Sequence, residues 1–218
     1  MTEISTKAQT RILEHQFHQQ DVQILRQQTQ YQGFFRLDKV FLRHRLFAGG
    51  WTPEFSRELF IRDLAVGVLL FDPWQDTVIL LEQFRIGALT DDISPWQFEL
   101  VAGILEEGEQ EAQVAHRETY EEAGCTLKDL LPLYSYWASP GGNSERLSLY
   151  CGIVDSQNAA GVYGLAHENE DIRTHVLPRT QVLQALQQGE ICNAMTLIAL
   201  QWLALHHQEL RARYVAEV

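Results

Sequence analysis

Short continuous runs of hydrophobic residues mark the chain after residue 62, as in strands that are buried on both faces. Residues 64–71 (LAVGVLLF) and 77–84 (TVILLEQF) are apolar and rich in β-branched side chains, and the segment DPWQD between them has the composition of a turn. The two runs therefore predict a β-hairpin. Residues 96–103 (WQFELVAG) predict one further strand, which leads into an acidic segment.

A helical period follows that strand. Small residues recur at positions i, i+3, i+7 and i+11 between residues 112 and 123, and Gly124 stands where a glycine commonly ends a helix. Strand-like composition then returns in residues 133–139, 146–155 and 171–177. Thr180 is expected to cap a helix over residues 181–188, and Asn193 to cap the last helix, from residue 194 to about residue 210.

The first sixty residues have a different character from the rest. They are polar and extended, with aromatic-rich stretches such as YQGFF and VFLRHRLF, and residues 48–51 (AGGW) predict a turn. We expect two domains: a small N-terminal antiparallel β module over residues 1–58 and a larger domain over residues 59–218. The order of elements predicts a mixed α/β (α+β) fold with helices packed on a sheet.

Composition narrows the functional classes. The chain of 218 residues has a net charge of -12 and a pI near 5.0, which argues against a nucleic-acid-binding protein. Its three cysteines are an odd number without a C-x-x-C pair, which indicates reduced thiols and a cytoplasmic location. The start lacks the apolar stretch of a secretory signal, and the longest apolar run is far short of the roughly 20 residues of a membrane span.

Residues 103–124 hold seven glutamates and a single arginine. On the predicted helix, Glu118 and Glu122 form an i,i+4 pair and Glu121 lies three residues after Glu118, so the three project to one side. Like charges at this spacing destabilise a helix by about 0.2–0.5 kcal/mol per pair. A divalent cation with oxygen ligands, such as Mg²⁺, would remove that repulsion. A solvated acidic face is the alternative, and this spacing alone leaves both open.

The full spacing of the segment is more specific. Gly103, five residues, Glu109, seven residues, Arg117-Glu118, two residues, Glu121-Glu122, one residue and a last glycine resemble the Nudix box at its charged and glycine positions. Two hydrophobic positions of the box hold Thr119 and Cys125, a departure that concerns packing rather than chemistry. The resemblance implies a Nudix fold, with a mixed β-sheet sandwiched by helices, and a hydrolase of nucleoside diphosphates that uses Mg²⁺, with Mn²⁺ as an alternative.

Two loops outside the box bear on the substrate. Residues 138–145 (ASPGGNSE) resemble an element of the ADP-ribose pyrophosphatases of this family, although Pro-Gly-Gly alone predicts only a tight turn. Residues 167–172 (HENEDI) form an acidic loop that resembles the one carrying a catalytic base and a metal ligand. The implied reaction is hydrolysis of ADP-ribose to AMP and ribose 5-phosphate by metal-activated water.

The resemblance also implies a role for each candidate residue. The expected metal ligands are the carbonyl of Ala102 and the side chains of Glu118, Glu122 and Glu170. The expected catalytic residues are Glu168 as the base, Glu121 and Arg117, with Glu109 as a partner of Arg117. The expected substrate contacts are Phe34, Phe35, Arg57, Arg85, Ser139, Gly141 and Glu145. The N-terminal module is expected to form a domain-swapped homodimer, so that Arg57 serves the site of the partner subunit.

Other interpretations stay open at this point. Phe34 and Phe35 are equally typical of core packing, and Arg85 of a surface arginine at a strand end. GDP-mannose or another nucleotide sugar is an alternative substrate. A non-catalytic ligand sensor of the same fold is the alternative from a different class of protein, although the complete set of box glutamates argues against it.

Overall fold

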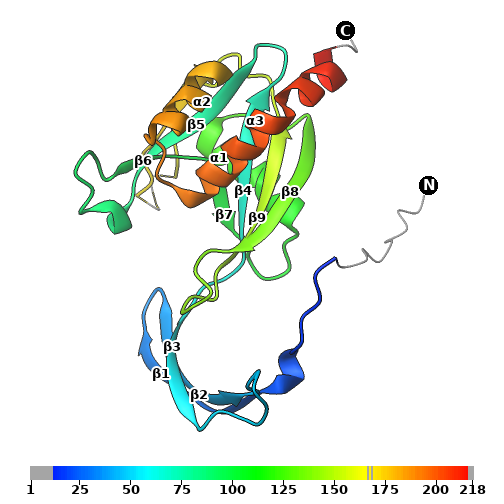
Figure 1. Ribbon diagram of the computed structural model, residues 1–218. Coiled ribbons are helices and arrows are strands. Elements are labelled where there is room, and N and C mark those ends of the chain that lie inside the picture. Colours follow the sequence, from blue (N-terminus) through cyan, green and yellow to red (C-terminus); the bar gives the residue numbers. More distant parts are fainter. Residues whose placement is uncertain (1–11, 166, 168, 216–218) are drawn as a thin grey trace. The chain divides into compact units, whose positions relative to one another are not determined.

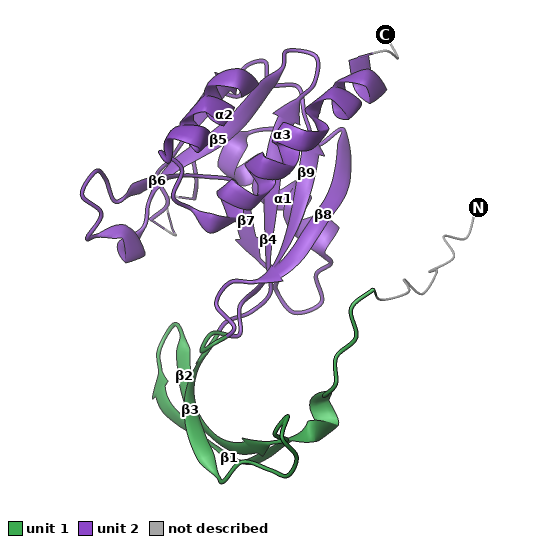
Figure 2. Cartoon of the chain, viewed as in Figure 1, with its two compact units in different colours: residues 1–61, 141–143 green, residues 62–140, 144–218 purple. Residues whose placement is uncertain are grey.

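The computed structural model describes residues 12–165, 167 and 169–215 of the chain. They divide into two compact units (Figure 2). The first comprises residues up to Ile61 together with Gly141–Asn143, and the second comprises the remaining residues from Arg62 onward. The first unit thus ends three residues beyond residue 58 and takes in three residues that are distant in sequence.

The first unit is an antiparallel sheet of three strands in the order β1-β2-β3. These strands are β1 (Val22–Gln32), β2 (Arg36–His44) and β3 (Phe55–Ile61), and a short 3-10 helix, Gln19–Asp21, precedes them. The predicted turn at residues 48–51 is confirmed, with Gly49 and Gly50 at φ values of 92° and 81°. Every residue of the edge strand β1 is exposed. Residues Gly141–Asn143 join this sheet through Phe60, whose N–H donates to the carbonyl of Gly142 at 2.8 Å.

The second unit is built on an eight-stranded mixed sheet (Figure 1). Its strands are β4 (Ala65–Asp72), β5 (Thr77–Phe84), β6 (Trp96–Glu99), β7 (Val101–Ile104), β8 (Asp129–Trp137), β9 (Arg146–Ile153), β10 (Gly161–Tyr163) and β11 (Ile172–Pro178). The main order is β10-β11-β5-β4-β9-β8, in which β4 and β9 run parallel and the other neighbours antiparallel. The predicted hairpin of β4 and β5 is confirmed.

The single strand predicted for residues 96–103 is wrong, because the segment forms two strands. The hairpin pairs over only three positions, from Leu70 opposite Ile79 to Asp72 opposite Thr77. Beyond them β4 and β5 separate, and each needs a new hydrogen-bonding partner. β6 pairs with β5, and β7 pairs with β4. Leu100, between them, belongs to neither strand. This crossing carries the chain from one hairpin strand to the other.

Three helices cover the two faces of this sheet. They are α1 (Glu111–Ala123), α2 (Arg179–Gln188) and α3 (Ala194–Val215). One apolar core, with Leu69, Phe71 and Leu80, lies between the sheet and α2 and α3. A second core, with Leu70 and Ile79, lies against α1 on the opposite face. Figure 1 shows α2 and α3 in front of the sheet and α1 behind it, so the predicted mixed sheet sandwiched by helices is confirmed.

The ends of the helices test the predicted caps. Gly124 ends α1 in the left-handed conformation (φ 61°), and the side-chain oxygen of Asn193 accepts the Thr196 N–H at 3.1 Å, so both predictions are confirmed. Thr180 is not a cap, because α2 begins one residue earlier, after Pro178. α3 extends five residues past residue 210, where the carbonyl of Tyr214 accepts the indole N–H of Trp74 at 3.1 Å.

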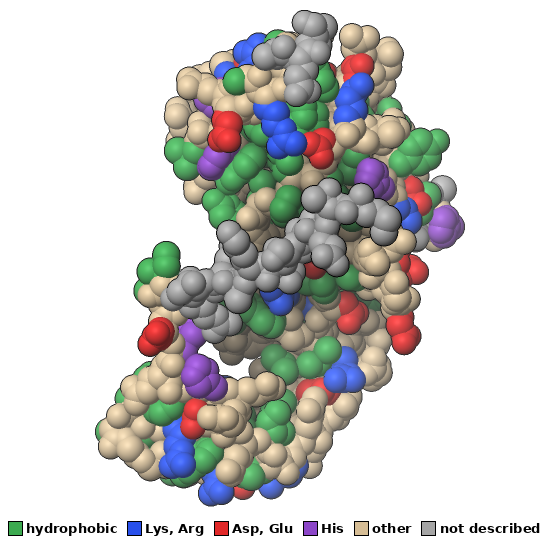
Figure 3. Space-filling model, turned by 90° about the vertical axis from the view of Figure 1, so that its right-hand side faces the viewer, with side chains coloured by type: hydrophobic (Ala, Val, Ile, Leu, Met, Phe, Trp, Pro, Cys, Tyr) green, Lys and Arg blue, Asp and Glu red, His purple; other side chains and the backbone are tan. Residues whose placement is uncertain are grey.

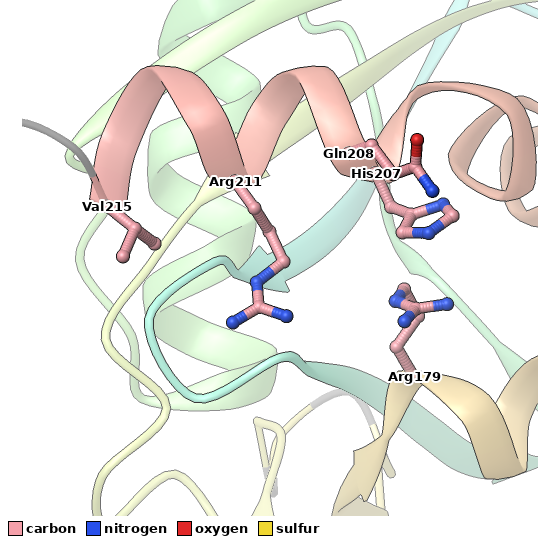
Figure 4. Close-up of a pocket in the computed structure, with 5 residues that line it drawn as sticks. All are labelled: Arg179, His207, Gln208, Arg211 and Val215. Atoms are coloured by element: carbon pink, nitrogen blue, oxygen red, sulfur yellow. The ribbon is translucent and has the colours of Figure 1, made fainter.

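An ion-pair cluster fastens α2 and α3 to the turn between β4 and β5. Asp76 in that turn accepts the Nε–H and Nη2–H of Arg179 at 2.8 and 2.9 Å, and Arg211 approaches it at 3.5 Å. Figure 4 shows Arg179, His207 and Arg211 around a shallow hollow of about 430 Å³. The cluster explains why α2 starts at Arg179: its backbone N–H also donates to the carbonyl of Asp76, at 2.9 Å.

The surface carries mixed charges. On the face shown in Figure 3, Lys and Arg side chains are scattered among Asp and Glu side chains. Within the described part of the chain, no helix combines the length and the apolar character that crossing a membrane requires.

Candidate active site

The loop before α1 fixes the start of the helix that carries the acidic residues. The carboxylate of Glu109 accepts the N–H of Glu106 at 3.0 Å, which closes a turn around Gly108, whose φ of 89° suits glycine. Gln110 is the N-cap residue of α1, and its own N–H donates to the side chain of Gln113 at 2.8 Å. The loop therefore places Glu109 beside the first turns of the helix.

Arg117 joins three of the seven glutamates of this segment. Its guanidinium donates to both oxygens of Glu109 at 3.3 Å, to Glu118 at 2.7 Å and to Glu121 at 3.4 Å. The predicted partnership of Arg117 with Glu109 is confirmed. Because one cation holds all three carboxylates, Arg117 sets the direction in which Glu118 points.

Glu122 is buried, and Glu118 is partly buried, with 15% of its side chain exposed. Their side chains lie where α1 packs against β7, and Glu122 is only 3% exposed. An oxygen of Glu122 accepts the backbone N–H of Ala102 at 3.0 Å. The carboxylate of Glu118 lies directly over Gly103, where any side chain would collide with it. The box glycine is therefore required by the close approach of this carboxylate to the strand.

Burial gives these carboxylates a high affinity for protons. It raises the pKa of Glu118 to about 7, although Arg117 opposes the rise. Burial also raises the pKa of Glu122 well above its usual range; the Ala102 N–H opposes this rise, and the negative charges of Glu118 and Glu170 add to it. Charged carboxylates in this arrangement repel one another, and a divalent cation can replace the protons they would otherwise take up.

The donor set fits a divalent metal ion in its chemistry. Carboxylate and carbonyl oxygens are the ligands that Mg²⁺ prefers. Glu170 interacts electrostatically with both Glu118 and Glu122, so the three carboxylates share one region. In the described ranges, however, no three His, Cys, Asp or Glu side chains are placed so that they could hold a metal ion. Glu118 is instead turned to Arg117, and Glu122 to the Ala102 N–H.

The loop after β10 brings Glu170 to this region. The carboxylate of Glu170 accepts the N–H of Leu165, and its own N–H donates to the Leu165 carbonyl, both at 3.3 Å. Gly164, at a φ of 104°, leaves room for Glu170 where a side chain would clash. The predicted base, Glu168, lies outside the described residues.

Glu99, beside Arg85, was missed by the sequence interpretation, and Asn193 was predicted only as a helix cap. Arg85 donates its Nε–H to one oxygen of Glu99 at 2.7 Å and forms an ion pair with the same oxygen through Nη2 at 2.7 Å, and Asn193 donates to the other oxygen at 3.0 Å. The signal in the sequence was a glutamate within the otherwise apolar stretch FELVAG. Its partners could not be read from the sequence, because they depend on the pairing of β6 with β5.

Apart from Arg85, the predicted substrate residues of the second unit lie around the loop between β8 and β9. The loop is closed at its base by the Ala138 N–H, which donates to the Glu145 carbonyl at 3.1 Å. The side chain of Glu145 pairs with Arg62 at 2.9 Å, and Ser139 is exposed. Ser144, which the sequence interpretation missed, binds the backbone of Arg62 at both its N–H and its carbonyl.

The remaining predicted substrate residues belong to the first unit. Phe34 is 87% exposed and stands edge-on to Phe35, which is partly buried and packs on Phe60, so core packing does not describe Phe34. Gly141 lies in the open, at the tip of the loop that joins this unit. The guanidinium of Arg57 lies over the ring of Phe55 at 4.7 Å.

Arg57 and the Phe34–Phe35 pair are separated within one chain. Phe35 precedes Arg36, which pairs with Ile61, whereas Arg57 stands four residues earlier on β3, opposite Val40. Four residues of strand span roughly 13 Å. Within the first unit of a single chain, therefore, Arg57 and this pair do not lie on either side of one adenine.

The sequence of this chain matches the model of a known protein family. The NUDIX domain model matches residues 61–211, which include the box, both loops and α3 up to Arg211. The chain belongs to the NUDIX family. Nudix hydrolases cleave pyrophosphate bonds and generally depend on divalent metal ions, which agrees with the carboxylates gathered beside β7.

Two curated Nudix relatives differ in their similarity to this chain. The ADP-ribose pyrophosphatase of Escherichia coli (strain K12) is 51% identical over 195 residues, covering 89% of this chain and 93% of the relative. The GDP-mannose pyrophosphatase of Escherichia coli O1:K1 / APEC is 31% identical over 160 residues, covering 72% of this chain and 82% of the relative. Among solved structures, an ADP compounds hydrolase aligns with a TM-score of 0.62 at 20% identity, over 84% of this chain and 95% of that one. At that identity the likeness shows the Nudix fold alone.

Proposed function

We propose that this Nudix protein hydrolyses ADP-ribose to AMP and ribose 5-phosphate and depends on Mg²⁺, with Mn²⁺ as an alternative. The observation that carries the reaction is the gathering of Glu118, Glu122 and Glu170, whose charged forms repel one another, at the junction of α1, β7 and the loop after β10. The choice of ADP-ribose is supported by 51% identity to an ADP-ribose pyrophosphatase over nearly its whole length, against 31% for the GDP-mannose relative.

The carboxylates of Glu118, Glu122 and Glu170, with the carbonyl of Ala102, would hold the metal. A bound divalent cation supplies charge neutralisation for the diphosphate and Lewis acidity that favours the hydroxide form of water. The protein contributes the orientation of these ligands: Arg117 directs Glu118, and the Ala102 N–H directs Glu122. Gly103 keeps the space that the Glu118 carboxylate occupies.

Proton transfer and substrate binding fall to other residues. Glu168 accepts the proton of the water that attacks phosphorus, and Glu170 and Glu121 are the next candidates for this role. The phosphorus–oxygen bond of the bridging oxygen breaks, and the two phosphorylated products leave. Arg85 donates to the diphosphate oxygens, and Ser139, Gly141 and Glu145 contact the substrate from the loop between β8 and β9.

The first unit completes the site of a second copy of the chain. We assign dimerisation to residues 1–58, in a domain-swapped homodimer, and the catalytic domain to residues 59–218. Phe34 and Phe35 stack on the adenine, and Arg57 reaches it from the partner subunit by cation–π contact. The separation of Arg57 from Phe34 along the sheet within one chain supports this assignment. The three free cysteines support a cytoplasmic location.

Purified protein tested with Mg²⁺ against ADP-ribose, GDP-mannose, NADH and ATP decides among the candidate substrates. We expect release of AMP from ADP-ribose at the highest kcat/KM. Faster turnover of GDP-mannose would assign the chain to the other nucleotide-sugar specificity. Absence of turnover with all four would favour a ligand sensor.

A further inference from the structure

Glu99, the last residue of β6, is a carboxylate to which neither the box nor the two loops gives a role. Its side chain is 5% exposed, and both of its oxygens have partners. One oxygen accepts the Nε–H of Arg85 at 2.7 Å and lies 2.7 Å from its Nη2 in an ion pair, and the other accepts an N–H of Asn193 at 3.0 Å. A buried charge is stable only when paired, so Glu99 depends on both partners.

Arg85 is held by Glu99 along one edge only. A guanidinium has five N–H donors in a planar fork, and Glu99 occupies the edge formed by Nε and Nη2. The side chain of Arg85 is 44% exposed. The Nη1 edge of the fork points away from Glu99 and suits two oxygens of a phosphate group.

The backbone and the helix behind Glu99 make this support rigid. The N–H of Arg85 donates to the Pro95 carbonyl at 2.9 Å, which fixes the point from which the side chain starts. Asn193, on the other side of Glu99, accepts the N–H and the hydroxyl of Thr196 at 3.1 Å, so it is itself anchored at the start of α3. A continuous set of hydrogen bonds therefore runs from α3 to the guanidinium.

The charge of Arg85 reaches the acidic residues of α1. Burial raises the pKa of Glu122, and the positive charge of Arg85 is among the influences that oppose this rise. Arg85 thus lies within electrostatic range of Glu122, one of the carboxylates that would bind the metal.

We propose that Glu99 is a positioning residue, which holds the guanidinium of Arg85 by one edge so that its other edge faces the diphosphate of the substrate. The inference rests on the proposed function, since it assigns the partner of Arg85 within that same site. A merely structural ion pair would contribute to stability and leave substrate binding unchanged.

The test is a double-variant cycle with ADP-ribose as substrate at saturating Mg²⁺. We expect Glu99→Gln to raise KM about tenfold while kcat changes less than about threefold, because the arginine loses its fixed direction and not its charge. We expect Arg85→Ala to raise KM at least as much. Adding Glu99→Gln to Arg85→Ala should then produce no further rise, because Glu99 acts through Arg85.

Asn193→Ser tests the anchoring of Glu99 to α3. Serine still caps α3, but it removes the donor to the second oxygen of Glu99. We expect it to lower the melting temperature and to raise KM less than Glu99→Gln does, because the bond from Arg85 to Glu99 remains while Glu99 loses its anchor. If Glu99→Gln fails to fold, Glu99→Asp is the second variant. It keeps the charge on a shorter side chain, so the guanidinium of Arg85 is drawn back from the substrate, and KM should likewise rise.

The outcomes separate this inference from the proposed function. Suppose that the wild-type protein hydrolyses ADP-ribose. An unchanged KM in the folded Glu99 variant would then overturn the role of Glu99 but not the proposed function. KM increases that multiply in the double variant would do the same. A wild-type protein that hydrolyses no ADP-ribose would overturn the proposed function and this inference with it.

Discussion

At the scale of single residues, Glu122 tests the metal assignment. Because burial raises its pKa, its charged form destabilises the metal-free fold at pH values above the unfolded-state pKa of about 4.3. Glu122→Gln keeps an oxygen for the Ala102 N–H and removes the charge. We expect the Mg²⁺-dependent rate to fall at least about 100-fold, as for loss of a metal ligand, and the metal-free protein to be no less stable than wild type.

The measurements are the rate as a function of Mg²⁺ concentration and urea unfolding in EDTA. Glu107→Gln, at an exposed glutamate of the same segment, is the control and should change neither quantity. Wild-type activity of the Glu122 variant at ordinary Mg²⁺ concentrations would remove Glu122 from the ligand set.

Residues whose roles depend on local spacing could be predicted from the sequence, and those that depend on strand register could not. The i,i+4 relation of Glu118 to Glu122, and the pairing of Arg117 with Glu109, follow from one loop and one helix. Glu99 was missed because it meets Arg85 only when β6 pairs with β5 and meets Asn193 only at the start of α3. No local pattern in the sequence predicts those two contacts.

At the scale of elements, the close approach of α1 to β7 can be tested through Gly103. A Cβ atom there would collide with the carboxylate of Glu118, which is the far end of a flexible side chain. We therefore expect Gly103→Ala to fold but to displace that carboxylate, weakening Mg²⁺ activation by about 10–100-fold. Activity titrated with Mg²⁺, together with circular dichroism, provides the measurement.

Gly87→Ala is the control for Gly103→Ala, since the added methyl group would meet open space. It should keep the wild-type dependence on Mg²⁺. Unchanged Mg²⁺ activation in a folded Gly103→Ala protein would mean that the position of Glu118 over the strand does not matter to metal binding.

The attachment of α2 and α3 to the turn between β4 and β5 predicts a pH-dependent stability. Hydrogen bonding to Arg179 lowers the pKa of Asp76 below its usual range. The stabilisation is therefore present above the unfolded-state pKa of about 3.9 and is lost as pH falls through the lower folded-state pKa. We expect Asp76→Asn to reduce the free energy of unfolding by about 1–3 kcal/mol at pH 7.

Urea unfolding of both proteins from pH 7 down to pH 3 checks this: the difference between wild type and Asp76→Asn should shrink on acidification. The exposed Asp92 provides the control variant, Asp92→Asn, with little difference at either pH. A difference for Asp76→Asn that stays constant with pH would show that the carboxylate charge is not what fastens α2.

The elements themselves were largely predictable, because hydrophobic period is a local property. The hairpin of β4 and β5 follows from two apolar runs, the central helix from its spacing of small residues, and the cap from the residue type of Asn193, and each of these is a local feature. The division of residues 96–103 into two strands does not follow from a local feature, because it arises where the hairpin separates and each of its strands takes a new partner. The start of α2 was likewise set by Asp76, about a hundred residues away, and not by Thr180.

At the scale of the whole molecule, the box spacing predicted the Nudix architecture and the composition predicted an N-terminal β module, but neither predicted what covers the sheet of the first unit. Its sheet leaves all of β1 exposed, and few of its residues are buried. A sheet of this kind gains stability by covering its edge or face, and a second copy of the chain is the partner that we propose. The hydrophobic pattern predicts which residues are buried within one chain. It does not predict which second chain covers the exposed part of this sheet.

A shared site predicts complementation between two defective chains. In a heterodimer of Arg57→Ala and Glu122→Gln copies, the chain with an intact box would receive Arg57 from its partner, while the other site would lack both groups. We expect such a heterodimer, purified through two different tags after co-expression, to show about half of the wild-type activity at substrate concentrations below KM, because one of its two sites is complete. Each variant homodimer should be strongly impaired under the same conditions. Activity of the heterodimer no greater than the mean of the two homodimers would place Arg57 in the site of its own chain, and a monomer in sedimentation at assay concentrations would exclude a site built from two copies.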